Sequence, residues 1–246
     1  MAIYGDYHTH TPYSHGKGTV LDNAMVAKNK GLKEIAITDH GFTHKTFGVK
    51  RSDIENIKID IEKAKNATGV NILFGIEENF ISLDGKIGVT EKDLEFLNIV
   101  NVGYHKLAKA ETKKDFFGLF LPNNLKWYTK RQIDKNTICV LKAIETQPIN
   151  IITHLGVGMP VNVGEVARLA KQKGVFIELN GKRISFTPAD MEALMKYDTD
   201  FILNSDAHTP EKVGDVRNGM SYVLKYHIPE KNIVNLNKRP DFKNLK

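Results

Sequence analysis

Hydrophobic and polar positions along the chain alternate between two periods, one typical of buried strands and the other of amphipathic helices. Short apolar, β-branched runs predict seven strands, at residues 3–8, 34–38, 71–76, 97–102, 149–153, 175–179 and 200–204. Apolar residues three and four positions apart predict helices between most of these strands, at residues 22–30, 52–67, 133–144, 163–173 and 216–226, with another beginning at Pro188. We also expect a hairpin at residues 80–89 around Asp84-Gly85, and a short helix from Thr90 to about Phe96.

The alternation of strands and helices predicts an α/β fold. Apolar strands separated by helices are typical of a parallel sheet with both faces covered. A chain of 246 residues matches the length of a closed barrel. Because seven strands are found rather than eight, we predict a distorted (β/α)7 TIM-like barrel, with a doubly wound open sheet as the alternative. No linker divides the chain, so we expect one domain over residues 1–246, ending in a basic tail from about residue 227.

Composition narrows the class of protein. Apolar residues make up 41% and charged residues 26%, which is typical of a globular domain. The single cysteine, Cys139, excludes a disulfide framework or a Cys-rich zinc ribbon, and we assign it no role. The first residues lack the pattern of a signal peptide, and no apolar run reaches the length of a membrane span. We therefore expect a cytoplasmic protein with no membrane partner.

The net charge of +6 is unevenly distributed. Residues 106–135 carry a net +5 and residues 225–246 a net +4. Such patches suit anionic substrates or nucleic acid, although solvated surface lysines would give the same count. The stretch 106–135 also contains Phe116, Phe117, Trp127 and Tyr128. It is either a lid over the site or a helical insertion at the periphery of the fold.

Histidines and carboxylates follow the ends of the predicted strands. The first strand runs into His8-Thr9-His10, and the last is followed by Asp206-Ala207-His208. Four further strands end at or just before His40, Glu77, His105 and His154. Because the carboxyl ends of parallel strands meet on one face of a barrel, these side chains should converge there. Clustered imidazoles and carboxylates indicate metal ions. His44 and His227 lack this placement, and we predict that both lie at the surface.

The motifs DYHTH, the following His15, ITDHG, GIEEN, GYH, ITHLG and SDAH occur in this order between residues 6 and 208. In sequence and order they resemble the PHP (polymerase and histidinol phosphatase) family, and most of all its stand-alone YcdX-like phosphatases. The resemblance implies a distorted seven-stranded barrel with metal ions at the carboxyl ends of the strands.

Carried over position by position, the resemblance implies three divalent metal ions. The first ion would be held by His8, His10, Glu77 and Asp206. The second would share Glu77 and also take His105 and His154. The third would be held by His15, His40 and His208. All nine positions carry residues able to bind a metal. Zinc is the expected ion, with manganese or iron as alternatives.

The resemblance implies a metal-dependent phosphatase that hydrolyses a small phosphorylated metabolite similar to histidinol phosphate. We expect attack on phosphorus by a metal-bridging hydroxide, with Glu77 and Asp206 as catalytic carboxylates and Arg183 holding the phosphate; Lys17 is a second candidate cation. One alternative is a phosphodiesterase or 3′-5′ exonuclease that acts on nucleic acid. Another is a non-catalytic binding module stabilised by metal. The sequence predicts no particular oligomeric state.

Overall fold

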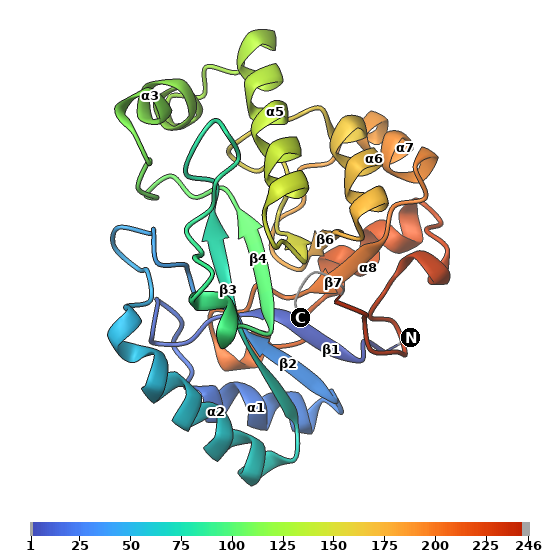
Figure 1. The fold of residues 1–246 in the computed structure, drawn as a ribbon. Helices are drawn as coiled ribbons and strands as arrows, with labels where there is room; N and C mark the ends of the chain where they lie inside the picture. Colours follow the sequence, from blue (N-terminus) through green and yellow to red (C-terminus); the bar gives the residue numbers. More distant parts are fainter. Residues whose placement is uncertain (1, 243–246) are drawn as a thin grey trace.

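The computed structural model describes residues 2–242 as a barrel of seven parallel strands in sequential order (Figure 1). The strands are β1 (Gly5–Thr9), β2 (Glu34–Ile37), β3 (Asn71–Asn79), β4 (Ile99–Gly103), β5 (Ile151–Ile152), β6 (Phe176–Asn180) and β7 (Phe201–Asn204). Between the first strand and the last, the Ala207 amide donates to the His8 carbonyl at 3.2 Å, and the His10 amide donates to the Ala207 carbonyl at 2.8 Å. These contacts nearly close the barrel. The predicted (β/α)7 barrel is therefore confirmed, and the open doubly wound sheet is wrong.

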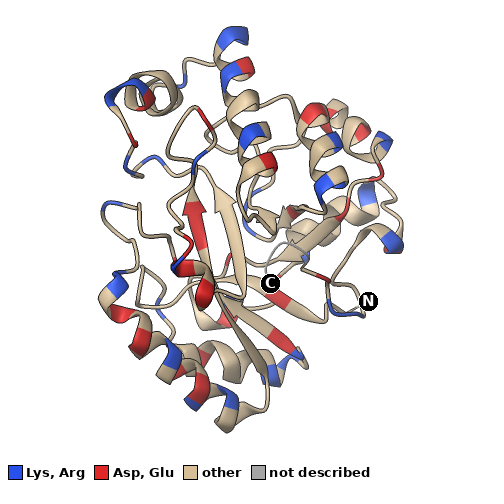
Figure 2. Ribbon diagram, in the orientation of Figure 1, with Lys and Arg blue, Asp and Glu red and all other residues tan. Residues whose placement is uncertain are grey.

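Helices cover the outside of the barrel. In Figure 1, α1 (Val20–Asn29) and α2 (Ile54–Thr68) lie together beside β1 and β2, whereas α5 (Lys130–Thr146), α6 (Val163–Lys173) and α7 (Pro188–Lys196) lie together on another side. The helix α8 (Arg217–Lys225) packs on β6 and β7. Figure 2 shows most Lys and Arg residues on helices and loops, while the strands are mainly uncharged apart from acidic segments, including one at the end of β3.

The helix boundaries follow from the local sequence. Thr187 caps α7 by accepting a hydrogen bond from the Asp190 amide, and the Asp190 side chain accepts one in return. Asn162 caps α6 in a similar way, and Gly174 ends that helix with φ of 70°. Both helices begin where the sequence predicted. The predicted helix at residues 52–67 is found as α2, preceded by a 3-10 turn, Arg51–Asp53.

Two short predicted elements differ from the structure. The expected hairpin at residues 80–89 forms only one isolated bridge, between Phe80 and Ile87, and no strands. Gly85 makes its turn with φ of 79°. The expected short helix after Thr90 is a single 3-10 turn, Asp93–Glu95. Both segments are too short to cover the sheet, so local turn geometry decides their form.

The interior of the barrel is filled by one apolar layer to which every strand contributes a residue. Its members are Tyr7, Ala36, Leu73, Ile99, Ile151, Phe176 and Ile202, and Val234 from the chain's C-terminal part joins them. Phe242 closes the layer, with its ring 5.0 Å from that of Tyr7 and 5.8 Å from that of Phe176. The filled interior leaves the opposite end of the barrel, where the strands finish, free to carry polar groups.

The described part of the expected basic tail, residues 227–242, packs against the barrel. The Asn235 side chain donates to the Gly5 carbonyl at 3.0 Å and to the Leu203 carbonyl at 2.7 Å, and accepts from the Leu203 amide at 3.0 Å. It thus joins the first strand to the last at the amino end of the barrel. Elsewhere, the π-helix Phe116–Phe120 lies between two short helices, α3 (Lys113–Asp115) and α4 (Leu121–Asn124). No helix within residues 2–242 has both the length and the apolar character to cross a membrane.

Candidate metal centre

The carboxyl ends of the strands gather the predicted ligands around one carboxylate, that of Glu77 on β3. The four nearest imidazole nitrogens are His154 Nε2 at 2.9 Å, His40 Nδ1 at 3.0 Å, His8 Nε2 at 3.2 Å and His105 Nε2 at 3.4 Å. The Thr153 hydroxyl donates to Glu77 at 2.9 Å and fixes its orientation. Residues from five strands, β1 to β5, thus meet at one point, as the barrel topology requires.

A second carboxylate, Asp206, follows β7 and lies close to three imidazoles. Its oxygen lies 3.3 Å from His208 Nδ1, 3.4 Å from His10 Nε2 and 3.8 Å from His8 Nε2. Asp206 and His154 both have positive φ, at 54° and 34°. Such backbone conformations cost free energy in residues other than glycine and concentrate at functional sites.

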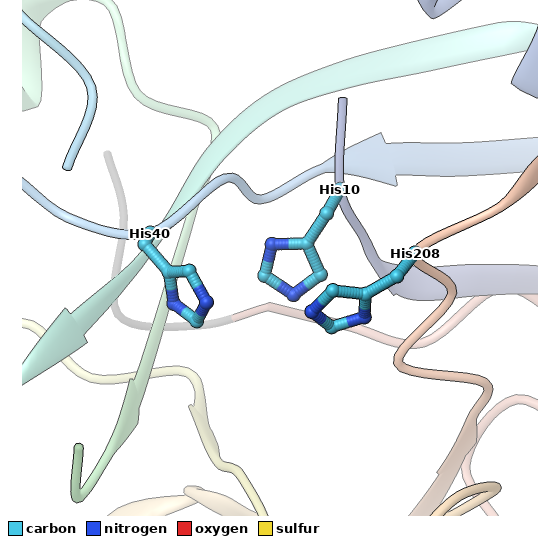
Figure 3. A group of neighbouring side chains, drawn as sticks. All are labelled: His10, His40 and His208. Carbon is cyan, nitrogen blue, oxygen red and sulfur yellow. The ribbon is translucent and has the colours of Figure 1, made fainter. Parts of the chain in front are cut away.

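His10, His40 and His208 come from three different strand ends and point toward one another (Figure 3). Their ligand atoms lie within 4.8 Å of one another, as do those of His8, His10 and Asp206 and those of His40, Glu77 and His105. His15 adjoins this group, with its ring 4.3 Å from that of His208. All nine predicted ligands are therefore brought together. His40, expected beside His15 and His208, is also within reach of Glu77 and His105.

The residues present fit a metal cluster. Within residues 2–242, the buried nitrogen His8 Nε2, both ring nitrogens of His10 and His40 Nδ1 make no hydrogen bond. A buried polar atom without a partner is costly, and imidazole nitrogens of this kind are good ligands for divalent transition metals. Together the site offers seven imidazoles and two carboxylates, a donor set that suits zinc, manganese or iron.

The electrostatics of the site agree with this fit. Burial lowers the pKa of His10 and of His105 well below the ordinary value, so both imidazoles are neutral at pH 7. Burial raises the pKa of Glu77, but His105 and His8 outweigh it, and the net pKa lies well below the usual range. Burial lowers the pKa of His8, but Glu77, Glu178 and Asp206 together raise it well above 6.5. Neutral imidazoles and ionised carboxylates are the forms that bind metal, so His10, His105 and Glu77 are ready to bind, whereas His8 would release a proton on binding.

Behind these side chains lies a buried carboxylate that the sequence did not single out, Glu178 on β6. One of its oxygens accepts from His8 Nδ1 at 2.7 Å and from the Asn204 side chain at 3.1 Å. The other accepts from the His154 amide at 2.9 Å and from the Asn180 side chain at 2.7 Å. A carboxylate can only accept, so His8 carries a proton on Nδ1 and turns Nε2 toward Glu77.

Two other polar residues, Asp39 and Asn79, also hold parts of the site in position. The Asp39 carboxylate accepts hydrogen bonds from the Thr11 amide and the hydroxyls of Thr11 and Ser14, and so holds the loop that carries His15. The Asn79 side chain lies 2.7 Å from His105 Nδ1.

A signal for Glu178 was present in the sequence, since a single acid within the apolar run VFIEL is unusual for a buried strand.

The prediction that His44 lies at the surface is wrong. It is only 8% exposed, and its ring stacks on that of His40 at 4.9 Å with 19° between the planes. The signal missed was its position four residues after His40, in a loop that folds back over the site. His227 is exposed, as predicted.

The cluster opens into a cavity of about 540 Å³, a volume suited to a small ligand. Besides several of the ligands, its lining includes His44, Phe47, Leu107, Lys182 and Arg183. Arg183 was predicted, whereas Lys182 was missed although it precedes Arg183 directly. Lys17 is exposed and does not line this cavity.

Most of the basic stretch 106–135 lies away from the cavity. Only Lys106 and Leu107 of this stretch line it. The remainder forms α3, the π-helix, α4 and the beginning of α5. The structure therefore favours the peripheral helical insertion over the lid.

Three comparisons place the chain among known proteins. The PHP domain model matches residues 6–182. The chain is 29% identical, over 94% of its length and 86% of the relative's, to a protein named probable phosphatase from Caldanaerobacter subterraneus. It is 26% identical, over 100% and 96%, to another probable phosphatase, from Clostridium botulinum. The crystal structure of histidinol phosphate phosphatase from Lactococcus lactis, complexed with zinc, L-histidinol and phosphate, has the same fold; the TM-score is 0.59 at 13% identity, covering 93% of this chain and 95% of that one.

Proposed function

The chain belongs to the PHP domain family, and from that premise we propose that it is a metal-dependent phosphatase that hydrolyses a small phosphorylated metabolite. The single observation that carries the proposal is the group of nine side chains able to bind metal, Glu77 and Asp206 among them, which opens into a cavity of about 540 Å³. Open clustered sites of this kind are typical of catalysis, because a purely structural metal site is closed by its four ligands. We take residues 1–246 as one catalytic domain.

We propose that the nine residues hold three divalent ions, with zinc as the expected metal and manganese or iron as alternatives. The first set is His8, His10, Glu77 and Asp206. The second is Glu77, His105 and His154, and the third is His15, His40 and His208. When bound, such ions would offset the negative charge on phosphate oxygens and supply a water-derived nucleophile at neutral pH.

The protein's own residues would then position the substrate. Glu77 and Asp206 offset the positive charge of the ions and hold the imidazoles in place. Lys182 and Arg183 line the same cavity, and their amides donate to Asn180 Oδ1 at 2.7 and 2.8 Å, which fixes the loop that carries them. We expect both cations to bind phosphate oxygens, Arg183 through its bidentate guanidinium.

Histidinol phosphate is the first substrate to test, since the Lactococcus lactis protein of the same fold was crystallised with L-histidinol and phosphate. The experiment combines elemental analysis of the purified protein with assays on p-nitrophenyl phosphate, its bis-ester and histidinol phosphate. We expect about three ions per chain, turnover of the monoesters and none of the bis-ester. Arg183→Gln should raise KM for monoesters, and unchanged KM and kcat would remove Arg183 from the site.

A second candidate, a phosphodiesterase or exonuclease, is favoured by the basic stretch at residues 106–135, where the side chains of Phe117 and Trp127 are 63% and 57% exposed. Shortening of single-stranded DNA that is lost in His8→Ala would support this candidate over the phosphatase. Full metal content with no activity on any ester would point to a binding module and contradict both.

A further inference from the structure

One histidine that lines the cavity, His44, is not among the nine proposed ligands. Its two ring nitrogens have different surroundings. Nδ1 accepts a hydrogen bond from the Phe47 amide at 3.1 Å, and the Thr46 hydroxyl lies 3.5 Å from the same atom. Nε2 has no hydrogen-bond partner within residues 2–242. The role of His44 therefore depends on what Nε2 can offer.

The bond to Nδ1 determines where the proton of the His44 ring lies. A backbone amide can only donate, so Nδ1 carries no proton and the neutral imidazole carries its proton on Nε2. Unlike the ring nitrogens of His10, Nε2 of His44 is not sealed from solvent. Because His44 lines the cavity, it presents an N–H group to a bound ligand without gaining or losing a proton.

The ring of His44 is held in one orientation by its neighbours. It stacks on His40 at 4.9 Å with 19° between the planes, and on Phe47 at 5.5 Å with 30° between the planes. Its side chain is only 8% exposed. The direction of the Nε2–H bond is therefore fixed before any ligand arrives.

The loop that carries His44 is fixed as well. The buried Glu78 carboxylate accepts from the Phe42 amide at 2.7 Å and from the Thr43 hydroxyl at 2.8 Å. The Lys109 amide donates to the Thr43 carbonyl at 2.8 Å. A donor that is already in place costs no reorganisation when charge develops on its acceptor.

The other residues that line the cavity leave one oxygen of a phosphate ester without a partner. The lining cations, Lys182 and Arg183 among them, suit the charged phosphate oxygens. In an in-line displacement the ester oxygen lies opposite the nucleophile, so a nucleophile at the ligands places it toward the cavity. Tyr104 also lines the cavity, but its hydroxyl donates to Asn124 Oδ1 at 3.0 Å. The N–H group of His44 remains available to the ester oxygen.

We propose that His44 is a catalytic residue whose neutral Nε2–H group donates a hydrogen bond to the ester oxygen of the substrate. The inference rests on the proposed phosphatase function and adds a residue that acts on the leaving group. It requires no particular alcohol.

The hydrogen bond acts while the ester bond breaks. A water-derived oxygen forms a new bond to phosphorus, and the electron pair of the breaking P–O bond stays on the ester oxygen. The Nε2–H group stabilises the negative charge that develops there. The proton lost by the attacking water passes through solvent to the leaving oxygen, and His44 keeps its own.

The test compares phenyl phosphate with p-nitrophenyl phosphate on zinc-loaded protein. Both leaving groups have the same ring, but the nitro group takes up charge and makes the leaving oxygen a weaker acceptor. His44→Phe keeps the stacked ring and removes the donor. We expect its kcat/KM to fall about 10- to 100-fold on phenyl phosphate, mostly in kcat, and about two- to fivefold on p-nitrophenyl phosphate.

His44→Gln is the complementary variant, because it loses the ring but keeps an NH2 donor at the same number of bonds from Cβ as Nε2. Both variants remove the acceptor of the Phe47 amide, so that loss is common to the two. We expect His44→Gln to be about five- to tenfold more active than His44→Phe on phenyl phosphate. Its preference between the two esters should stay within about threefold of the wild type.

His227→Phe is the matched control, since it makes the same substitution at an exposed histidine outside the cavity. It should leave kcat and KM unchanged for both esters. Zinc content and Tm should match the wild type in His44→Phe, because His44 is not a proposed ligand and the stacking is kept.

Equal losses on the two esters in His44→Phe would overturn the inference, because they would mean that His44 supports the site without acting on the leaving oxygen. Greater activity of His44→Phe than of His44→Gln on phenyl phosphate would overturn it too, since the ring and not the donor would then matter. A lower zinc content in His44→Phe would assign His44 to the metal centre and also overturn it. All three results leave the phosphatase function intact. Hydrolysis of no phosphomonoester by the wild type would refute the proposed function itself.

Discussion

Replacing Glu178 by glutamine changes one buried carboxylate oxygen into an NH2 group while keeping the size of the side chain. In the native protein both oxygens accept hydrogen bonds, from His8, Asn204, the His154 amide and Asn180. The glutamine can satisfy only the two donors that face its remaining oxygen. The other two donors would face an NH2 group that cannot accept.

The structure gives the size of the effect. Each buried donor left without an acceptor costs about 1–3 kcal/mol. The loss is partly offset because a neutral amide is cheaper to bury than a carboxylate. We therefore expect the free energy of unfolding of the metal-free protein to fall by about 2–3 kcal/mol. His8 also loses the ionised acceptor that orients its ring, and such losses lower metal affinity about 10- to 100-fold, or about 1.4–2.7 kcal/mol.

The assay is a zinc titration of metal-free protein in competition with a chromophoric chelator, accompanied by urea unfolding of the same samples. Glu34→Gln is the matched control. Glu34 is also a buried carboxylate, bonded to Tyr7 at 3.0 Å and Arg239 at 3.0 Å, but it lies at the amino end of β2, away from the metal centre. It should lower stability and leave zinc affinity unchanged.

The reasoning would be refuted by a Glu178→Gln variant that binds zinc as tightly as the wild type while its stability falls. That result would mean that His8 holds its orientation without the carboxylate. Equal losses of zinc affinity in Glu178→Gln and Glu34→Gln would also refute it, because the effect would then follow general stability and not the contact with His8.

Three further perturbations test other parts of the structure. Glu77→Gln removes the charge at the centre of the imidazoles and should reduce the metal content by at least one ion per chain, measured by elemental analysis; wild-type content would contradict the central role of this residue. Ile57→Ala truncates a fully buried side chain on α2 and should lower the free energy of unfolding by about 2–5 kcal/mol in urea, with unchanged metal content. A decrease in the free energy of unfolding below about 1 kcal/mol would show that the surroundings of Ile57 are less tightly packed than in the structure. Chelation of the metal should lower Tm, since ions at 100 times their Kd stabilise the native state by about 2.7 kcal/mol; an unchanged Tm would mean that the cluster does not bind them.

Much of the barrel could be predicted because its strands and helices have strong local patterns. The helix α6 was predicted with the bounds that the structure has, 163–173, and α7 was predicted to begin after Thr187. Segments with weak local patterns were predicted less accurately. The stretch 80–89 has a turn at Gly85 but no flanking strands, and β5 is reduced to Ile151–Ile152 because its pairing with β4 and β6 involves only these two residues.

The gathering of the predicted ligands at one face was also predictable, because parallel strands of a barrel present their carboxyl ends together. What the sequence could not provide was the distance between side chains far apart along the chain. His8 and Glu178 are 170 residues apart and lie 2.7 Å from each other. No periodic pattern encodes such a contact.

The sequence by itself therefore determined the order of strands and helices, the barrel, and the set of imidazoles and carboxylates at its rim, since each depends on local periodicity and on a general rule of topology. Only the tertiary structure decided that His44 is buried against His40, that Phe47 lines the cavity, and that Asn235 joins β1 to β7. These features depend on how loops and the C-terminal segment pack on the finished barrel. Such packing is set by contacts between distant segments, which exist only after the strands have come together.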